Sequence, residues 1–433
     1  MSGGGGAATG LQPRRLFYGW YIVGAGTLNS ALLLGLVFYG FGIFMESLIG
    51  EFGWAPAAVA FGFTLQRMEA GLFAPVVGYL IDRFGPRPVA LVGVAVNGAA
   101  FLLFAAVQSL LQFYVASLLI ALGQSMAAFA PFTTSIVYWF QRYRARAVSF
   151  MMAGTGIGTI GVYPLVALIE SIGWRGALVV VALLIWVVGG ATVMTLRTRP
   201  EEWGSAPDGD RPDDRTTAQM GPEDQLQRTG GVETREALRS PAFWFLLASA
   251  LVFGFANLGW VVLQFPALQA KGLSAGLASA AVALYGVASI AIRIAVGWFG
   301  DRLGRQRMLL GSFALQSLGL AVFAAADRFS HLLPYYVLYA LGHAAYLVAF
   351  QTIVADYFGT RRFATIRGWI GMISSIGGAA GPPLGAWIYE ITASSDLAFA
   401  VFAAVVSLGV PAMWLADRYR PVQEPAHWSG ARG

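Results

Sequence analysis

Long apolar runs are the feature that most constrains how this chain can fold. Each run is near or above the ~20 residues that an α-helix needs to cross the hydrocarbon core of a bilayer. Because lipid leaves no partner for unpaired backbone N–H and C=O groups, runs of this length are expected to be helical. The sequence therefore predicts an all-α membrane protein with twelve transmembrane helices, at residues 16–45, 57–81, 89–107, 111–139, 148–170, 176–196, 241–269, 277–300, 308–326, 333–355, 368–389 and 397–416.

Composition agrees with a membrane protein and disfavours an enzyme. The chain is 57% hydrophobic and 12% charged, whereas soluble domains have roughly 25% charged residues. It contains no cysteine and only three histidines, which are scattered, so no disulfide, thiol nucleophile or metal cluster is expected. The sequence also lacks the P-loop that ATP-driven pumping would need. We therefore expect no catalytic residue, no metal site and no cofactor.

The distribution of arginine predicts the orientation in the membrane. If the amino terminus is cytoplasmic, nearly all of the 28 lysines and arginines fall in cytoplasmic segments, Arg367 included, and only Arg175, Lys271 and Arg328 face outward. Such an asymmetry is typical of the positive-inside rule. We expect a multi-pass protein of the plasma membrane (in bacteria, the inner membrane) with both termini cytoplasmic. The basic net charge then reflects topology and does not indicate nucleic-acid binding.

A polar segment divides the chain into two similar halves. Residues 197–240, which include PDGDRPDD and GPEDQLQR, have no sustained apolar periodicity, and the pattern predicts a solvated linker. The predicted organisation is a flexible amino terminus (1–15), a six-helix bundle (16–196), a cytoplasmic linker (197–240), a second six-helix bundle (241–416) and a cytoplasmic tail (417–433).

The two halves carry an internal repeat. A shift of 219 residues places GYLIDRFGPRPVAL (78–91) on GWFGDRLGRQRMLL (297–310), and ALGQ (121–124) on ALGH (340–343). A parallel repeat of this kind predicts a ligand site near the bilayer midplane, between halves that rock to give alternating access. We expect the protein to work as a monomer in the bilayer.

The stretch MMAGTGIGTIG (151–161) has the G-x-G-x-x-G spacing of dinucleotide-binding loops. It lies inside an apolar run and follows a basic loop, whereas nucleotide binding requires a preceding strand and a helix amino terminus. The eleventh run has a similar stretch, SSIGGAAGPPLG. Small residues at every fourth position allow helices to approach closely. We therefore expect helix packing here, on surfaces that slide during transport.

The loops GYLIDRFGPR and GWFGDRLGR resemble the signature loop of the major facilitator superfamily. The stretches FYGWYIV, WFQRYRARAVSFMMAGTGIG and PEEWGSAPDGD resemble its monocarboxylate transporter and oxalate/formate antiporter branch. The resemblance implies the major facilitator fold and loop residues that cap helix ends and pair across the halves, closing one access state. These gating candidates are Asp82, Arg83, Arg87, Asp301, Arg302 and Arg305. The alternative is that the loop charges only orient helices and bind lipid headgroups.

Arg293 is the main candidate for substrate binding. It lies eight residues before Asp301, about 12 Å along a helix and thus close to the midplane. Ser289 and Tyr285 precede it by one and two turns on the same face. A guanidinium matches a carboxylate bidentately, and the resemblance implies that an arginine at this place binds the substrate carboxylate. The alternative is an arginine that snorkels to the interface or pairs with a structural acid.

The sequence departs from the resembled pattern in three places. Monocarboxylate carriers have an acid one turn before this arginine, where Ser289 stands here, and a lysine in the first span, where the polar residues are Asn29 and Tyr39. The oxalate branch has a second cation in span eleven, but GWIGMISSIGGAAGPPLGAWIYE contains no lysine. Proton coupling at the first pair and dicarboxylate binding by two such cations are therefore not expected.

Other polar residues at membrane depth are candidates for coupling or for lining a cavity. Glu69 is either a proton carrier or a structural partner of a cation, and Arg67, about 200° around the same helix, is either a second anion anchor or structurally paired. His343 aligns with Gln124 in the repeat and is either a proton relay or a neutral, hydrogen-bonded side chain. Further cavity candidates are Asn257, Tyr163 and Tyr346.

Three function classes agree with these features to different degrees. A secondary carrier of a small organic anion, coupled to protons or to a counter-anion, agrees with the bundle, the repeat and Arg293. An efflux carrier of neutral or cationic compounds would share the fold but would favour buried acids, and span five lacks the Gly-Pro antiporter motif of that group. A membrane receptor is least favoured, because the chain has no folded soluble domain to relay a signal.

Overall fold

The computed structural model describes residues 17–33, 38–203, 205–209, 231–326, 331–392 and 394–420. Within these ranges, the side chains of 38–42, 63, 67, 159 and 162 are not described. The side chains of two predicted site residues, Tyr39 and Arg67, are therefore outside the described part of the molecule. Most residues of the predicted terminal segments are outside it as well.

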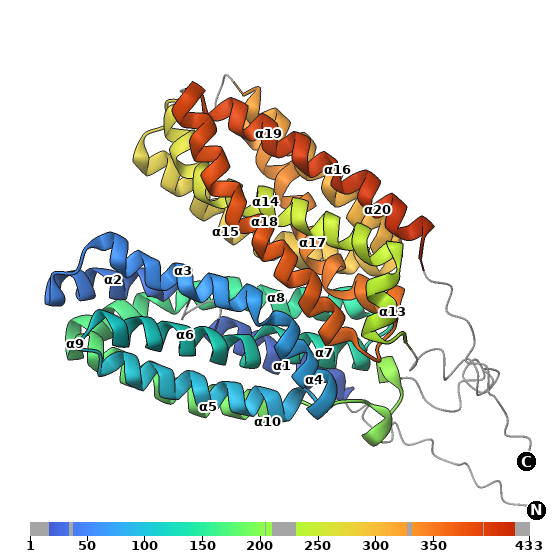
Figure 1. Cartoon of the computed structure of the whole chain (residues 1–433), viewed down its shortest axis with the longest axis horizontal. Helices are drawn as coiled ribbons and strands as arrows, with labels where there is room; N and C mark the ends of the chain where they lie inside the picture. Colours follow the sequence, from blue (N-terminus) through green and yellow to red (C-terminus); the bar gives the residue numbers. More distant parts are fainter. Residues whose placement is uncertain are drawn as a thin grey trace, which may run out of the picture.

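The described chain is almost entirely helical (Figure 1). The first half contains α1 (Tyr18–Ser30), α2 (Phe38–Phe52), α3 (Pro56–Leu72), α4 (Ala74–Phe84), α5 (Pro86–Ala105), α6 (Leu110–Ala127), α7 (Phe129–Trp139), α8 (Arg144–Ile160), α9 (Val162–Leu184) and α10 (Gly190–Met194). The second contains α13 (Thr234–Arg239), α14 (Pro241–Ala270), α15 (Ala275–Leu303), α16 (Arg305–Ala324), α17 (Leu332–Phe358), α18 (Phe363–Thr392), α19 (Ser395–Ser407) and α20 (Gly409–Arg418).

Eight helical segments among the described residues are long and apolar enough to cross a membrane. They match predicted spans three, four, six to ten and twelve. The other four predicted spans are also helical, but they are interrupted or less apolar: residues 34–37 between α1 and α2 are not described, α3 carries Gln66 and Glu69, and α8 and α18 are rich in glycine. Breaks inside spans follow from sequence, since Pro75 and Pro131 lie two and three residues after the breaks at Phe73 and Ala128, in the first turn of the next helix.

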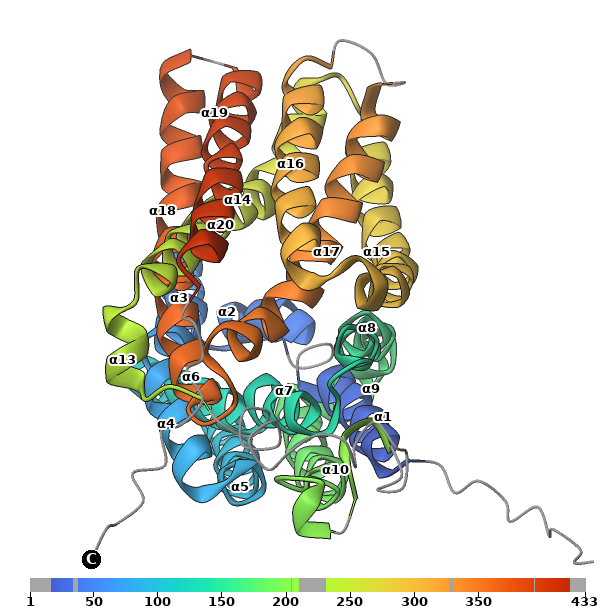
Figure 2. The same ribbon diagram turned by 90° about the vertical axis from the view of Figure 1, so that its right-hand side faces the viewer.

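The helices form two bundles with separate cores. One large core contains buried residues between Ile22 and Leu196, and the other contains residues between Ala237 and Ala416, joined by Val137 and Ala145 from the first half. The bundles pack against each other through α4 with α18 and α8 with α15. They meet at the end of the molecule where α13 lies and α20 ends, and diverge toward the other end (Figures 1 and 2). The meeting end is called the inner end below, because its loops are those predicted to be cytoplasmic.

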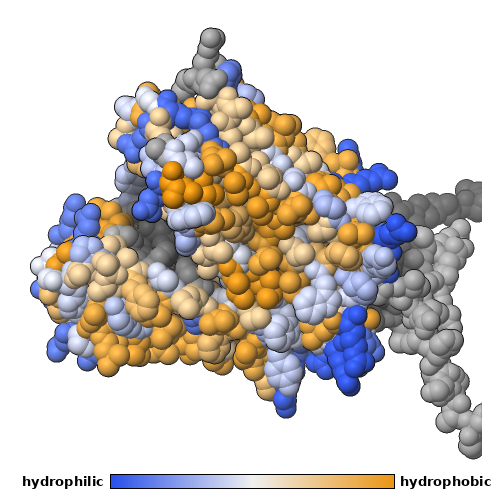
Figure 3. Space-filling view, turned by 45° about the horizontal axis from the view of Figure 1, so that its top comes forward, coloured by the Kyte–Doolittle hydropathy of each residue, from blue (hydrophilic) through white to orange (hydrophobic). Residues whose placement is uncertain are grey.

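The surface of the molecule suits a bilayer. Large apolar side chains such as Leu111, Val187 and Leu284 are exposed, as expected of residues that face lipid rather than water. The space-filling view shows apolar residues spread over both halves and a hollow between the halves at the end away from the inner end (Figure 3).

The glycines of α8 and α18 pack helices closely, as predicted from sequence. A Cβ on Gly154 would lie 2.1 Å from the carbonyl oxygen of Thr27 on α1, and one on Gly381 would lie 2.0 Å from that of Phe255 on α14. Both contacts are inside one half, so in this conformation these two glycines are not part of the contact between the halves. That they lie on surfaces that slide during transport stays a prediction. Gly156 does face the other half, because its Cβ would meet the Ile290 side chain of α15 at 2.3 Å.

Candidate functional site

At the inner end, Asp82 in the last turn of α4 contacts the first turn of α18 in the other half. Its carboxylate accepts hydrogen bonds from the backbone N–H of Ala364 (3.1 Å) and Thr365 (2.8 Å) and from the Thr365 hydroxyl (2.6 Å). The first N–H groups of a helix have no partner within the helix and form the positive end of its dipole. A carboxylate of one half thus caps a helix of the other half.

Asp301 makes the equivalent contact in the second half of the repeat. It lies near the end of α15, accepts a hydrogen bond from the backbone N–H of Ala145 (3.0 Å) and forms an ion pair with Arg146 (3.1 Å), both in the first turn of α8. The two halves are therefore joined at the inner end by two contacts that the internal repeat relates to each other.

Glycine allows both contacts to form. Gly78 and Gly297 precede Asp82 and Asp301 by four residues and so lie on the same helix face. A Cβ on Gly78 would lie 2.2 Å from the Ala364 carbonyl oxygen, and one on Gly297 would lie 2.1 Å from the hydroxyl oxygen of Ser149 on α8. Any side chain at these positions would hold the helices apart and withdraw the carboxylate from the helix that it caps.

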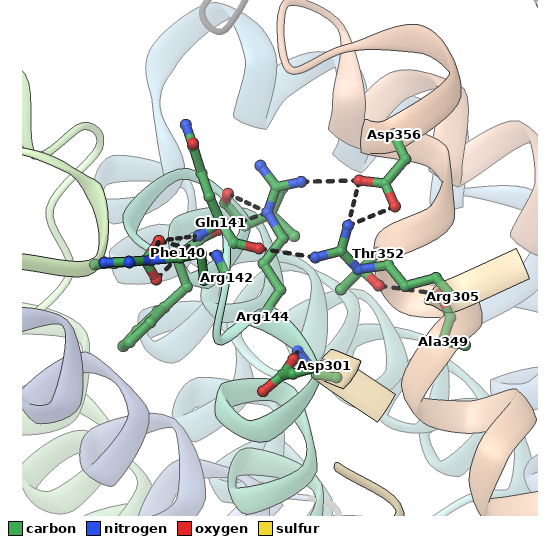
Figure 4. A network of polar contacts seen from close by, with 12 residues as sticks. Phe140, Gln141, Arg142, Arg144, Asp301, Arg305, Ala349, Thr352 and Asp356 are labelled. Atoms are coloured by element: carbon green, nitrogen blue, oxygen red, sulfur yellow. Dashed lines mark hydrogen bonds and ion pairs between the residues drawn. The ribbon is translucent and has the colours of Figure 1, made fainter. Parts of the chain in front are cut away.

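A third contact across the halves surrounds Asp356, near the end of α17 (Figure 4). Arg144 of the first half and Arg305 of the second both point toward its carboxylate, with N···O distances of 3.1 and 2.5 Å. Arg305 also donates to the backbone carbonyl of Gln141 in the first half (2.8 Å). Asp356 and Arg144 were not predicted from sequence, because the repeat does not duplicate them: Val137 and Phe363 stand at the equivalent positions.

The six gating candidates divide into two groups. Asp82, Asp301 and Arg305 reach the opposite half, whereas Arg83 donates to Tyr79 in its own helix (3.0 Å) and Arg87 contacts the sulfur of Met194 in its own half (3.2 Å). Arg302 is exposed and makes no hydrogen bond or ion pair with the described residues. The predicted pairing across the halves is thus wrong for Arg83, Arg87 and Arg302 in this conformation.

The described ends of the linker attach to equivalent loops of the two halves. The Asp208 carboxylate accepts hydrogen bonds from the backbone N–H groups of Gln141 (3.1 Å) and Arg142 (2.9 Å), before α8. Glu233 pairs with Arg361 and Arg362 before α18, each at 2.9 Å. Arg362 donates a hydrogen bond to the Glu233 carboxylate, and this bond raises the pKa of Arg362 above its usual value. Each linker end therefore stabilises the loop before a helix that an aspartate of the other half caps, namely α8, capped by Asp301, and α18, capped by Asp82.

At the opposite end, charged contacts stay inside each half. Glu51 pairs with Arg175 and accepts a hydrogen bond from the indole of Trp174 (2.7 Å), all within the first half. Lys271 pairs with Asp396 within the second half (2.7 Å). The described ionic contacts therefore join the halves at the inner end and leave them separate at the other end.

Three candidate residues form one polar cluster in the second half. The His343 ring on α17 contacts the Asn257 amide nitrogen on α14 through Nε2 (3.0 Å) and the Tyr285 hydroxyl on α15 through Nδ1 (2.9 Å). With the Asn257 amide nitrogen as the donor, Nε2 accepts, and this arrangement suits a neutral ring that donates from Nδ1 to the Tyr285 hydroxyl. This geometry favours the hydrogen-bonded alternative for His343 over the proton relay.

Arg293 lies where α15 packs against α8 of the other half. Its guanidinium donates to the Thr155 hydroxyl (3.1 Å) and to the Met152 carbonyl oxygen (3.5 Å), both on α8. The Ser289 hydroxyl one turn earlier donates to the Gly286 carbonyl of its own helix (2.7 Å). Arg293 thus reaches from one half to the other by contacts that include neutral acceptors.

A cavity of about 390 Å³ lies between the halves. Residues from α3, α4, α6, α7, α14, α17 and α18 line it, with apolar walls that include Phe253 and Phe350. Its polar lining consists of Gln66, Gln124, Ser125, Thr134, Tyr346, Gln351, Arg367 and Ser374. Two cavity candidates from the sequence, Gln124 and Tyr346, are in this lining.

Comparison with known proteins agrees with this architecture. The sequence profile of the Major Facilitator Superfamily matches residues 27–283 and 258–432. The chain belongs to the major facilitator superfamily. It is 25% identical to rat monocarboxylate transporter 13 over 90% of this chain and 87% of that protein. It is also 25% identical to the oxalate:formate antiporter of Oxalobacter formigenes, over 93% and 94% of the two chains.

Solved structures show the same fold at low identity. The proton:xylose symporter XylE superimposes with a TM-score of 0.72 at 14% identity, over 93% of this chain and 96% of that one. The protein therefore has the major facilitator fold of twelve helices, and it is a multi-pass membrane protein. The stretch with dinucleotide-binding spacing is part of α8 in this fold, a helix in the contact between the halves.

Within this major facilitator fold, Arg367 is the functional candidate that sequence reasoning missed. It was assigned to a cytoplasmic loop because span eleven was expected to begin at residue 368. Helix α18 begins at Phe363, so Arg367 lies in the helix and lines the cavity. It stands one residue before GWIGMISSIGGAAGPPLGAWIYE, the stretch of span eleven that contains no lysine.

Glu69 lies behind the cavity wall. It is 6% exposed, and one carboxyl oxygen accepts a hydrogen bond from Ser125 (3.3 Å), a residue of the cavity lining. The other oxygen has no hydrogen-bond partner among the described residues, and no described cation pairs with the carboxyl group. The structural partner that was one alternative for Glu69 is therefore absent from the described side chains.

Two cavity candidates lie away from the cavity. Asn29 is fully buried in the first half, where its amide donates to the Ala127 carbonyl (3.1 Å) and accepts from the Thr192 hydroxyl (3.3 Å). Tyr163 is 84% exposed. Neither residue lines the described cavity, and the geometry of Asn29 indicates a role in packing three helices of the first half.

Proposed function

We propose that the protein is a secondary transporter that moves a small organic anion of the monocarboxylate type across the membrane by alternating access, acting as a monomer. Membership of the superfamily supports transport, and the names of its relatives support the substrate class. The ionic contacts at the inner end, together with the separation at the other end, correspond to one of the two access states. With the inner end cytoplasmic, that state faces outward.

Arg293 carries the assignment of an anion. A permanently charged guanidinium at membrane depth is costly unless it meets a partner or a wet cavity, and it binds a carboxylate through two parallel hydrogen bonds. Arg293 projects from α15 to α8, so a carboxylate bound to it would lie next to helices of both halves. Substrate binding would then be linked to the movement of the halves.

The test of this function is uptake into proteoliposomes. Labelled monocarboxylates, their neutral amides and a set of cationic compounds are offered with and without a pH gradient. We expect uptake of carboxylates alone, and its response to the gradient distinguishes proton coupling from anion exchange. Uptake of neutral or cationic compounds without carboxylates would support the alternative, an efflux carrier.

For proton coupling, we propose Glu69 as the group that carries the proton. Its carboxyl group is buried with a single neutral hydrogen-bond donor from the cavity wall, so nothing described there neutralises a negative charge. We expect Glu69→Gln to abolish accumulation driven by a pH gradient while leaving counterflow exchange, because exchange needs no net protonation cycle. The measurement compares both modes in proteoliposomes.

The matched control for Glu69 is Glu46→Gln, which removes an exposed carboxyl group from α2. It should retain both modes of transport. His343→Gln is expected to weaken transport by disturbing the cluster with Asn257 and Tyr285, without separating accumulation from exchange. Unchanged accumulation in Glu69→Gln would reject the proton-carrier role.

We also propose that both termini lie in the cytoplasm. The chain has no cysteine, so labelling of a single introduced cysteine shows on which side of the membrane that position lies. A membrane-impermeant maleimide should label Gln108→Cys, between α5 and α6, in intact cells. It should label Arg302→Cys, at the inner end, only after the cells are permeabilised. The reverse pattern would contradict this orientation.

A further inference from the structure

The cavity between the halves presents hydrogen-bond donors without an acid to receive them. Arg367 donates from Nε (2.8 Å) and from one terminal nitrogen to the same side-chain oxygen of Gln351. No carboxylate lies within ion-pair distance of it among the described residues. Its other terminal nitrogen makes no hydrogen bond there, so one edge of the guanidinium remains for a carboxylate.

Two further donors in the same lining lack partners. Tyr346 is 3% exposed, and its hydroxyl makes no hydrogen bond with the described residues. The amide nitrogen of Gln66 is likewise buried without a partner. Buried polar groups are nearly always hydrogen-bonded in folded proteins. Donors on α3 and α17 that line a cavity containing an arginine are therefore available to an acceptor bound in the cavity, and an anion is such an acceptor.

The rest of the lining suits the apolar part of a small organic anion. Phe253 stacks on the Tyr346 ring with ring centroids 3.5 Å apart, and Phe350 stacks on the same ring with centroids 4.7 Å apart. The volume of about 390 Å³ is within the range of small-molecule sites. Aromatic walls with a few convergent donors are the usual composition of such sites.

The cavity lies directly against the contact between α4 and α18 that closes the inner end, called the inner closure below. Gly78, Ala364 and Gly368 line it. Gly78 packs on Ala364, whose N–H donates to Asp82, and Gly368 packs on Ala74 of α4. Arg293 is not part of the lining. The cavity is therefore separate from the contact of Arg293 with α8, and it borders the place that must open for release at the inner end.

We propose that this cavity is a second anion-binding site, in which Arg367 binds the carboxylate of a small monocarboxylate. Tyr346 and Gln66 donate to the same carboxylate, and Gln351 is a positioning residue that holds the guanidinium. In terms of the proposed function, the site holds the substrate next to the inner closure before release. Its existence as a binding site can be tested without transport.

The experiment uses the absence of native cysteine. Ala70 lines the cavity, and Ala70→Cys provides one thiol whose rate of reaction with a water-soluble maleimide is measured in purified protein. The probes are lactate, lactamide and chloride. We expect lactate to slow labelling, lactamide to have no effect, and Arg367→Gln to weaken protection by lactate about ten- to hundredfold, as for loss of charge-assisted hydrogen bonds.

The controls separate this site from the proposed function. Arg418→Gln removes an exposed arginine of α20 and should leave protection unchanged. Arg293→Ala should abolish transport and keep protection, so a failure of the transport proposal is distinguishable from a failure of this one. Tyr346→Phe, which keeps the ring, should weaken protection less than Arg367→Gln does.

Three outcomes would overturn the proposal. Lactate that gives no protection, or equal protection in Arg367→Gln, would show that Arg367 does not bind the carboxylate. Protection by chloride alone would show that the cavity takes an inorganic anion and not an organic acid. If Arg367→Gln does not fold, Arg367→Lys keeps the charge without the planar fork and should show the same weakened protection.

Discussion

Arg293→Lys is expected to lose most carboxylate transport although it keeps the positive charge. An ammonium group cannot reproduce the two parallel hydrogen bonds of a guanidinium to a carboxylate. Hydrogen bonds to charged groups contribute about 1.5–3 kcal/mol each, so we expect exchange to fall roughly 10- to 100-fold.

The measurement is the initial rate of counterflow exchange of one accepted monocarboxylate. Arg293→Ala should lose exchange completely, while Arg83→Lys, a change on the exposed face of α4, should keep it. An arginine that only snorkels to the interface predicts a nearly unchanged lysine variant, since lysine snorkels as well. A lysine variant with wild-type exchange would therefore reject Arg293 as the anion anchor.

The fold was predictable because its causes are local in the sequence. Apolar runs of membrane length require helices, and the 219-residue repeat predicts two equivalent bundles. The repeat also predicted Asp82 and Asp301 as equivalent positions. In the structure the carboxylate of each accepts a hydrogen bond from the first turn of a helix in the opposite half. The spacing of glycine and aspartate by one helical turn is what makes these contacts readable from sequence.

The site was harder to predict because its parts come from separate helices. Nothing local in the sequence indicates that Asn257, Tyr285 and His343 meet, since they lie on α14, α15 and α17. Arg367 was missed for a different reason, namely an error of five residues in the start of a helix that follows a basic loop. Arg144 and Asp356 were missed because they break the symmetry on which the sequence argument relied.

Gly78→Leu is expected to hold the inner end open. The Cβ alone would lie 2.2 Å from the Ala364 carbonyl oxygen, a backbone atom that cannot turn away, so α4 and α18 must separate. Asp82 would then lose its hydrogen bonds to Ala364 and Thr365. A loss of about 3 kcal/mol, the low end for several charge-assisted hydrogen bonds, shifts the balance of the two access states by roughly 100-fold.

The reporter for this shift is Ala70→Cys, labelled in inverted vesicles by an impermeant maleimide. We expect Gly78→Leu to make the thiol reactive from the inner side and to abolish net transport. Gly311→Leu, at a glycine of α16 with nothing within 4 Å of its Cβ position, is the matched control and should behave as the parent. Inner labelling that stays at the parent level in a folded Gly78→Leu protein would show that this contact does not hold the inner end closed.

Gly297→Leu should act in the same direction but less strongly, although the repeat makes the two glycines equivalent. The atoms closest to its Cβ position belong to the Ser149 side chain, the hydroxyl oxygen at 2.1 Å, which can rotate, and the Cβ at 2.6 Å, while the nearest backbone atom, the Ala145 carbonyl oxygen, is 3.1 Å away. At Gly78, by contrast, the three closest atoms are all backbone atoms. On this side, Arg144 and Arg305 also join the halves through Asp356. Removing that contact as well, with Asp356→Asn, should bring Gly297→Leu to the level of Gly78→Leu. The order of the three variants thus tests whether the closure is symmetric in its helix caps and asymmetric in its ion pairs.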